Sequence, residues 1–183
     1  MRKILRLILA AAVLLPLASC LGDDDTDLEK KYGEWKKTNE EFVEKAAAER
    51  NADGTPVYER IVPDWSKDIY VLMRWHNDRS LTEKNLVPLD NSTCAVKYTL
   101  MLADSTIADA SHKNYADSIY SCMPKSNVPG FWTALTHMHV GDSVTVVVPW
   151  KAGYGTVGTT GIKPFSTLIF SIKLKEITAY QKK

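Results

Sequence analysis

The chain has 183 residues, of which 45% are hydrophobic, and its 23 basic side chains nearly balance its 22 acidic ones. This length and apolar content are sufficient for one domain with a buried core plus an appendage. The balanced charge argues against nucleic-acid binding, which requires a basic surface.

The first residues have the pattern of a lipoprotein signal peptide. Arg2 and Lys3 precede an apolar run that ends in Leu-Ala-Ser-Cys at residues 17–20. A charged start, a short apolar run and small residues before one cysteine are typical of export, followed by cleavage before a lipidated thiol. The alternative, a retained membrane helix, requires about 20 apolar residues, and this run is shorter. We therefore predict a signal peptide over residues 1–19 and lipidation of Cys20.

The residues after Cys20 bear on localisation. Leu21 stands where an aspartate often favours retention in the inner membrane, so we expect a lipid anchor in the outer membrane. The acidic triplet at residues 23–25 is either a surface-export signal or part of a solvated tether over residues 20–26. Cleavage removes three basic side chains and no acidic one, which leaves 20 against 22 and a net charge of −2.

An amphipathic helix is predicted over residues 27–50. Apolar residues recur there at helical spacing among Lys and Glu, namely Leu28, Tyr32, Trp35, Phe42, Val43 and Ala46. The Asp53-Gly54 pair then indicates a turn. The apolar stripe either packs on the following domain or binds a partner.

The rest of the chain, residues 57–180, has the alternation of β-strands. Strands are predicted at residues 57–62, 68–75, 93–102, 118–122, 143–149 and 167–177. A short helix is expected from about Phe131 to His139, and Gly141 is a natural residue to end it.

Two blocks in this region resemble a known family. The Gly153-Tyr154-Gly155 turn and the later Ile-Lys-Pro-Phe-Ser-Thr-Leu-Ile-Phe run at residues 162–170 are similar to AYG…GIPPNSTLVF. Residues 128–142 are similar to VIxGW…AL..M..G(D/E), so residues 93–177 resemble the FKBP-type peptidyl-prolyl isomerases. The resemblance implies an α+β fold, in which an antiparallel half-barrel sheet wraps around a short helix. It also implies that residues 57–92 belong to the same domain.

The resemblance implies a prolyl-binding pocket. Tyr154 matches the tyrosine that hydrogen-bonds the substrate carbonyl, and Asp109 matches an acid of the site. Rotation of an X-Pro bond needs no nucleophile, metal or cofactor, because differential binding of the twisted amide is sufficient. The positions that match the walls and floor, each of which is otherwise an ordinary core residue, are Tyr98, Val128, Phe131, Ile162 and Phe170.

Some positions depart from the family pattern. Ala108 and Ser118 stand where the family has phenylalanines, and Lys163 replaces a proline of the flap. The pocket is therefore expected to be shallower and wetter, with weakened isomerase activity. Tyr115 or Tyr120 is a candidate to refill it.

Cysteine and histidine give little further chemistry. Aligned on the family, Cys94 and Cys122 lie nearly opposite each other on neighbouring antiparallel strands, either as a disulfide or as two small core residues. His137 and His139 are two residues apart on a predicted helix and face different ways, so no metal site is expected.

The leading hypothesis is an FKBP-like lipoprotein of the cell envelope that binds proline-containing segments of exported proteins. The alternatives are a non-catalytic, chaperone-like interaction module and a surface lipoprotein for glycan or nutrient capture. The last alternative depends on the stacking faces of five tryptophans.

Overall fold

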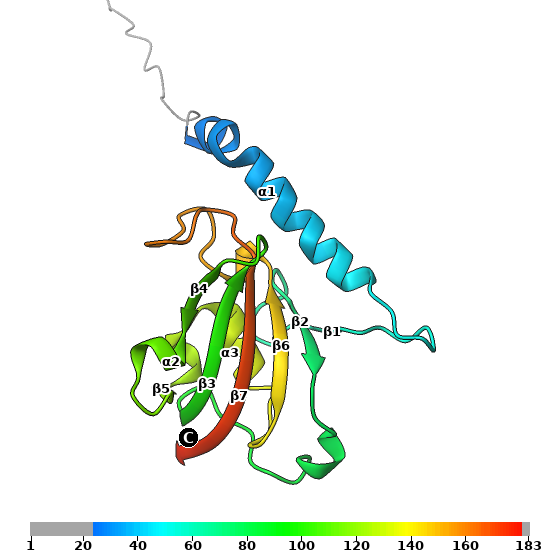
Figure 1. The fold of residues 1–183 in the computed structure, drawn as a ribbon, viewed down its shortest axis with the longest axis vertical. Helices are drawn as coiled ribbons and strands as arrows, with labels where there is room; N and C mark the ends of the chain where they lie inside the picture. Colours follow the sequence, from blue (N-terminus) through cyan, green and yellow to red (C-terminus); the bar gives the residue numbers. More distant parts are fainter. Residues whose placement is uncertain (1–23, 181–183) are drawn as a thin grey trace, which may run out of the picture.

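One antiparallel sheet of seven strands organises the protein, which is described here over residues 24–180 by a computed structural model (Figure 1). The strand order is β1-β2-β6-β7-β3-β4, and β5 also pairs with β3. The strands are β1 (Glu59–Ile61), β2 (Val71–Trp75), β3 (Thr93–Leu102), β4 (Ile107–Ala110), β5 (Tyr120–Cys122), β6 (Ser143–Val148) and β7 (Leu168–Ala179). The helices are α1 (Asp24–Ala48), α2 (Ser111–Asn114) and α3 (Pro129–Leu135), with 3-10 turns η1 (Arg79–Leu81), η2 (Pro124–Ser126) and η3 (Trp150–Ala152). The expected α+β half-barrel is confirmed.

The sheet has an apolar inner face and a polar outer face. In β6, Val144, Val146 and Val148 are fully buried and pack in the same core as Phe131 of α3. Even-numbered residues of β3 and residues 168, 170, 172 and 174 of β7 join them, while alternate positions such as Lys97 point outward. This alternation is the pattern that the sequence shows, because successive side chains of a strand lie on opposite faces.

Several elements differ in length from the sequence prediction. The strand expected at 118–122 begins only at Tyr120, because Ser118 adopts φ +61°, which is incompatible with extended backbone. Helix α3 ends at Leu135 rather than His139, and the chain turns until Gly141, which adopts φ +100°. The first two strands are also shorter than expected, and both belong to the same sheet as the rest.

Helix α3 packs directly on β6 through a glycine. A Cβ atom on Gly130 would lie 2.3 Å from Cγ1 of Val148, so no larger residue fits unless Val148 shifts. Pro129 in the first turn suits the start of a helix, where its missing N–H costs nothing. This close approach sets the height of Phe131 above the sheet.

Helix α1 packs on the domain, which is one of the two alternatives that the sequence left open. Val43 and Ala46 are buried against Leu72 and Val147, outward residues of β2 and β6. Its helical range, Asp24–Ala48, begins and ends earlier than the predicted range of 27–50. In Figure 1 the helix lies diagonally across one end of the sheet, close to the loops that precede β7.

Polar contacts tie α1 to the segment before β7. The Asn39 side chain is fully buried, and its Oδ1 accepts a hydrogen bond from the Thr167 backbone N–H at 2.6 Å. The Thr167 hydroxyl donates to the Asn39 carbonyl at 3.1 Å, and Trp35 Nε1 donates to the Ser166 hydroxyl at 3.1 Å. The helix therefore supports the base of the loop that returns into β7.

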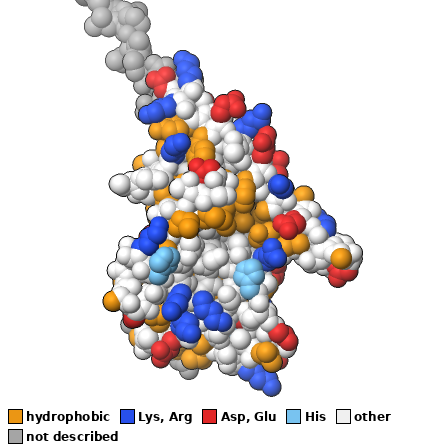
Figure 2. All heavy atoms as spheres, in the orientation of Figure 1, with side chains coloured by type: hydrophobic (Ala, Val, Ile, Leu, Met, Phe, Trp, Pro, Cys, Tyr) orange, Lys and Arg blue, Asp and Glu red, His pale blue; other side chains and the backbone are white. Residues whose placement is uncertain are grey.

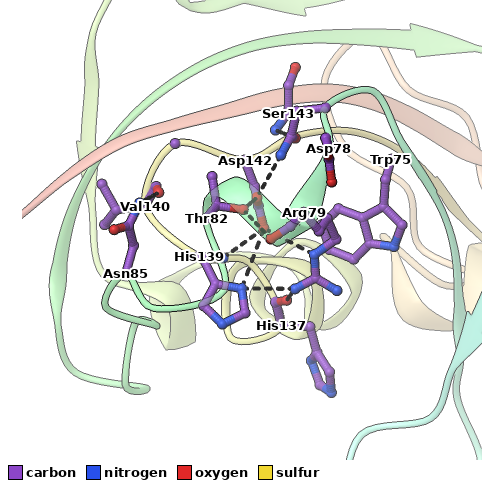
Figure 3. Close-up of polar contacts among 12 residues, drawn as sticks. Trp75, Asp78, Arg79, Thr82, Asn85, His137, His139, Val140, Asp142 and Ser143 are labelled. Atoms are coloured by element: carbon purple, nitrogen blue, oxygen red, sulfur yellow. Dashed lines mark hydrogen bonds and ion pairs between the residues drawn. The ribbon is translucent and has the colours of Figure 1, made fainter.

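A buried carboxylate organises the opposite end of the sheet (Figure 3). Asp142 is fully buried and accepts hydrogen bonds from the Thr82 hydroxyl at 2.5 Å, the Asn77 amide at 3.0 Å and the His139 N–H at 2.9 Å. The Arg79 guanidinium lies 3.4 Å from the same carboxylate and stacks on Trp75. Asp142 thereby connects the loop around η1 to the turn that leads into β6.

Cys94 and Cys122 face each other across the β3–β5 pair. They are direct register partners, which confirms their predicted adjacency. Both are buried free thiols. Burial raises the pKa of Cys94 to about 11, and burial with the neighbouring Cys94 raises that of Cys122 to about 12.

None of the helices between residues 24 and 180 is long and apolar enough to cross a bilayer. The predicted signal peptide over residues 1–19 and the lipidation site Cys20 lie outside the described residues. The predicted tether over residues 20–26 overlaps the start of α1, which begins at Asp24.

Candidate prolyl-binding pocket

A hollow of about 300 Å³ lies between the inner face of β3, the start of α3 and the loop after η3. Of the seven residues that the sequence assigns to a pocket, the structure brings six together there. The seventh, Ile162, is buried in the core and does not line the hollow. The lining residues are Tyr98, Leu100, Asp109, Tyr120, Ser126, Asn127, Val128, Phe131, Tyr154 and Phe170.

Aromatic rings in edge-to-face contact form the floor and one wall. Phe131 lies 5.0 Å from Phe170 and 6.1 Å from Tyr98, with interplanar angles of 69° and 81°. Tyr98 in turn lies 5.5 Å from Tyr120. Edge-to-face pairs at these separations are favourable, and they lock each ring in place. The hollow is therefore preformed and largely apolar at its base.

Asp109 holds Tyr98 in position. Its Oδ2 accepts a hydrogen bond from the Tyr98 hydroxyl at 2.5 Å, while Oδ1 accepts from the Ala110 N–H at 2.8 Å and the Asn114 amide at 2.7 Å. Burial alone would raise the pKa of Asp109, but these hydrogen bonds outweigh it, so the pKa is lowered. Burial and the bond to Asp109 raise the pKa of Tyr98. The pair is thus an ionised carboxylate and a neutral phenol.

Tyr154 presents a free donor to the hollow. It is half-buried and follows η3, where the Gly155 N–H donates to the Trp150 carbonyl at 2.9 Å. Within residues 24–180, no protein group accepts a hydrogen bond from its hydroxyl, in contrast to Tyr98. Burial, with a smaller contribution from the charge of Asp109, raises its pKa. The phenol therefore stays protonated and available to a ligand carbonyl.

The two positions without the family's phenylalanine have different outcomes. Tyr120, one of the two sequence candidates, lines the hollow, and Tyr115 stacks behind it at 5.7 Å. Ser118 does not line this hollow and instead borders a second one on the outer face of the sheet. Ala108 is exposed and sits in a β-bulge, between the pairs Leu100–Asp109 and Met101–Ile107. One wall is refilled, and the other has no aromatic side chain.

The sequence did not indicate two polar rim residues, Ser126 and Asn127. The Asn127 Oδ1 accepts a hydrogen bond from the Tyr120 hydroxyl at 3.1 Å, and its amide donates to the Met123 carbonyl at 2.8 Å. Asn127 therefore fixes the new wall ring. The sequence did place Asn127 directly before Val128, a residue assigned to the pocket, and this was the indication available for Asn127.

The tryptophans lie on different elements and contact different partners. Trp65 stacks on Trp132 at 4.2 Å, the Arg79 guanidinium stacks on Trp75, and Trp150 contacts Phe165 edge-on. This dispersed arrangement gives no support to a shared glycan platform. Between residues 24 and 180, no group of three or more His, Cys, Asp or Glu side chains could hold a metal ion.

Comparison with known proteins agrees with this geometry. The family model of the FKBP-type peptidyl-prolyl cis-trans isomerases matches residues 85–175. The FKBP-type 22 kDa peptidyl-prolyl cis-trans isomerase of Escherichia coli K12 is 34% identical over 92 residues, which are 50% of this chain and 44% of that protein. FkpA from the same strain is 30% identical over 94 residues, 51% of this chain and 34% of FkpA. The chain thus spans less than half the length of these curated relatives.

Solved structures share the fold. The crystal structure of FkpA from Escherichia coli gives a TM-score of 0.67 at 22% identity, covering 86% of this chain and 65% of that one. A peptidyl-prolyl cis-trans isomerase from Pseudomonas syringae pv. tomato gives 0.63 at 23% identity, covering 79% and 94%. On these sequence matches, residues 85–175 of the chain belong to the FKBP-type peptidyl-prolyl cis-trans isomerase family.

Proposed function

We propose that this protein binds proline-containing segments of polypeptides and catalyses cis/trans isomerisation of their X-Pro bonds. The observation that carries the proposal is the convergence of Tyr98, Asp109, Val128, Phe131, Tyr154 and Phe170 on one hollow. These residues come from separate strands, a helix and a loop, so their meeting in one place is a property of the fold and not of local sequence.

The hollow is suited to twisting an amide. The barrier to rotation is about 18–20 kcal/mol because resonance is lost in the twisted state. A proline ring seated over Phe131 would be in an apolar environment, which suits a less dipolar amide. The Tyr154 hydroxyl would donate to the substrate carbonyl, and the Tyr98–Asp109 pair would keep the wall fixed. Catalysis then consists of tighter binding to the twisted form than to either planar one.

The activity is proposed to be weaker than that of a family member with a complete aromatic wall. Ala108 is exposed in its bulge and adds no ring to the hollow. Less of the twisted amide is then desolvated, and each 1.36 kcal/mol of lost transition-state binding costs tenfold in rate.

The test is an exchange assay on a short X-Pro peptide, with Tyr154→Phe as the diagnostic variant. Loss of one hydrogen bond made only in the twisted state should lower kcat/KM by about tenfold. The matched control is Tyr180→Phe, at an exposed tyrosine directly after β7, which should leave the rate unchanged. Peptide binding without any exchange above background would instead identify a non-catalytic, chaperone-like module.

We further propose that the protein acts in the cell envelope, anchored through lipidated Cys20 to the outer membrane. The support is the signal pattern of residues 1–20 and the acidic stretch that follows. Wild-type protein should fractionate with membranes, and Cys20→Ala should move it to the soluble fraction. A wild-type protein found soluble, with a mature N-terminus beyond Cys20, would exclude the anchor.

A further inference from the structure

The outer face of the sheet carries two adjacent rows of polar side chains. In one row Lys97 lies opposite Lys173, which lies opposite Ser143. The next row is made of Thr99, Ser171, Thr145 and Arg74, again as direct register partners. Short hydroxyl side chains thus form a floor between long basic ones.

The opposition of Lys97 and Lys173 is unfavourable by itself, because like charges directly across a strand pair repel. Neither ammonium group forms an ion pair with a carboxylate among residues 24–180. The Lys173 Nζ donates to the Gly141 carbonyl at 2.5 Å, which fixes its position on the face. Because neither charge is neutralised by a carboxylate among residues 24–180, both are available to a bound anion.

A shallow hollow of about 370 Å³ is lined by five residues of these rows, Lys97, Thr99, Ser143, Ser171 and Lys173. His76 and His112 border it from opposite sides, on the chain after β2 and on α2, and Ser111 and Ser118 complete the rim. No Asp or Glu of residues 24–180 contributes to the lining. In Figure 2 Lys, Arg and His side chains gather over this face of the sheet, below α1.

The start of α2 borders one edge of the hollow. Strand β5 pairs with β3 at residues 94–96 and β4 pairs with it at residues 99–101, so Lys97 and Tyr98 lie in the gap between the two. Among residues 24–180, the Tyr98 N–H there donates to the Ser111 hydroxyl, at 3.1 Å. Tyr98 also lines the prolyl-binding hollow on the inner face, so the two hollows meet at this residue.

We propose that this outer hollow binds an acidic segment of a partner polypeptide. Carboxylates would pair with Lys97 and Lys173, and the Ser171 and Thr99 hydroxyls, which line the same hollow, would donate to the remaining carboxylate oxygens. The complementary charge selects an anion, and an open, shallow surface of paired strands suits a chain better than a compact small molecule. The site does not depend on isomerase activity, because it lies on the opposite face of the sheet.

The test is fluorescence anisotropy with labelled hexaglutamate, which contains no proline. Lys97→Gln with Lys173→Gln should weaken binding by roughly tenfold or more, since both paired cations are lost. The matched control, Lys30→Gln with Lys45→Gln, makes the same change in net charge on α1 and should stay within about twofold. Lys97→Gln alone should reproduce part of the loss, which protects the test if Lys173 is needed for folding.

Added salt should weaken binding of the peptide, because exposed charges are screened. Equal losses in the two double variants would overturn the proposal, as would no binding of hexaglutamate at low salt. If polyphosphate of equal charge bound more tightly than hexaglutamate and lost its affinity in the Lys97 and Lys173 variants, the hollow would be reassigned to a phosphorylated ligand. In all these outcomes the X-Pro exchange rate is measured separately, so failure here is distinguishable from failure of the isomerase proposal.

Discussion

At the scale of single residues, Asp142 carries a full charge in a place where solvent does not reach it. Its hydrogen bonds to Thr82, Asn77 and the His139 N–H offset the loss of hydration that burial would otherwise impose. Asp142 does not line the aromatic hollow, so we assign it a role in the fold.

Asp142→Asn should lower the free energy of unfolding by about 3 kcal/mol, because the buried donors and Arg79 lose their charged acceptor. Urea denaturation measures the change. Asp64→Asn, at an exposed aspartate paired loosely with Lys67 at 3.8 Å, is the control and should shift the midpoint little. A loss as small as that of the control would show that the network is dispensable.

The same residue predicts a pH dependence. Burial raises the pKa of Asp142, but its hydrogen bonds and Arg79 lower it more, so the folded-state pKa lies below the usual value of 3.8. The unfolded chain therefore takes up the proton first. The stabilisation is fully present above pH 3.8 and is lost as the pH falls through the folded-state value. The stability difference between wild type and Asp142→Asn should accordingly shrink in acid, and a constant difference would contradict this assignment.

The two core thiols should be unreactive in the folded protein. Cys94 is fully buried and Cys122 is 7% exposed, and their raised pKa values leave little thiolate at pH 8. In Cys20→Ala protein, Ellman's reagent should label both cysteines only as fast as the chain unfolds. Rapid labelling under native conditions would mean that β5 opens. No thiols after denaturation without reductant would mean that a disulfide has formed.

At the scale of elements, the bulge in β4 and the start of β5 determine which aromatic walls exist. Ala108→Phe adds a ring beside Asp109 and should raise kcat/KM by about tenfold. This is the rate expected to be regained when one missing aromatic wall is restored. Ser118→Phe should not, because Ser118 borders the outer hollow and its φ of +61° strains a bulky residue. The two variants are compared in the X-Pro exchange assay, and a larger gain from Ser118→Phe would reverse the assignment of the walls.

Helix α1 should stabilise the loop before β7 through one side chain. Asn39→Ala leaves the buried Thr167 N–H without an acceptor and should cost about 1–3 kcal/mol. Thr38→Ala, one residue earlier on the exposed side of the helix, removes only a bond to the Glu34 carbonyl and is the control. Chemical denaturation of both variants measures the contrast, and equal effects would mean that α1 contributes by apolar packing alone.

At the scale of the whole molecule, long strands were predictable and short-range irregularities were not. Strand β3 was predicted with its observed bounds, because ten residues of alternation give a strong signal. Strand β4 was missed, since four residues containing a bulge carry no clear period. The family motifs placed six pocket residues together, but Ile162 lies in the core, where a tight turn from Thr159 directs it.

Other features depend on contacts that no local pattern contains. The Asn39–Thr167 pair joins residues 128 positions apart, so its buried amide could not be distinguished from a surface asparagine. Ser118, which the sequence placed in a strand, adopts a φ of +61°, and an unusual φ at a serine leaves no mark in the sequence.

The central position of β7 has a consequence for how the chain acquires its structure. Strand β7 is the only connection between β6 on one side and β3 on the other within the described sheet. Until residues 168–179 have been synthesised, a nascent chain holds two separate partial sheets, each with an unpaired edge. The β3–β7 contacts also span a long stretch of sequence, and closing such long loops slows folding. The domain should therefore fold in one late, cooperative step, governed by insertion of this strand, and its earlier segments should remain protease-sensitive until that step is complete.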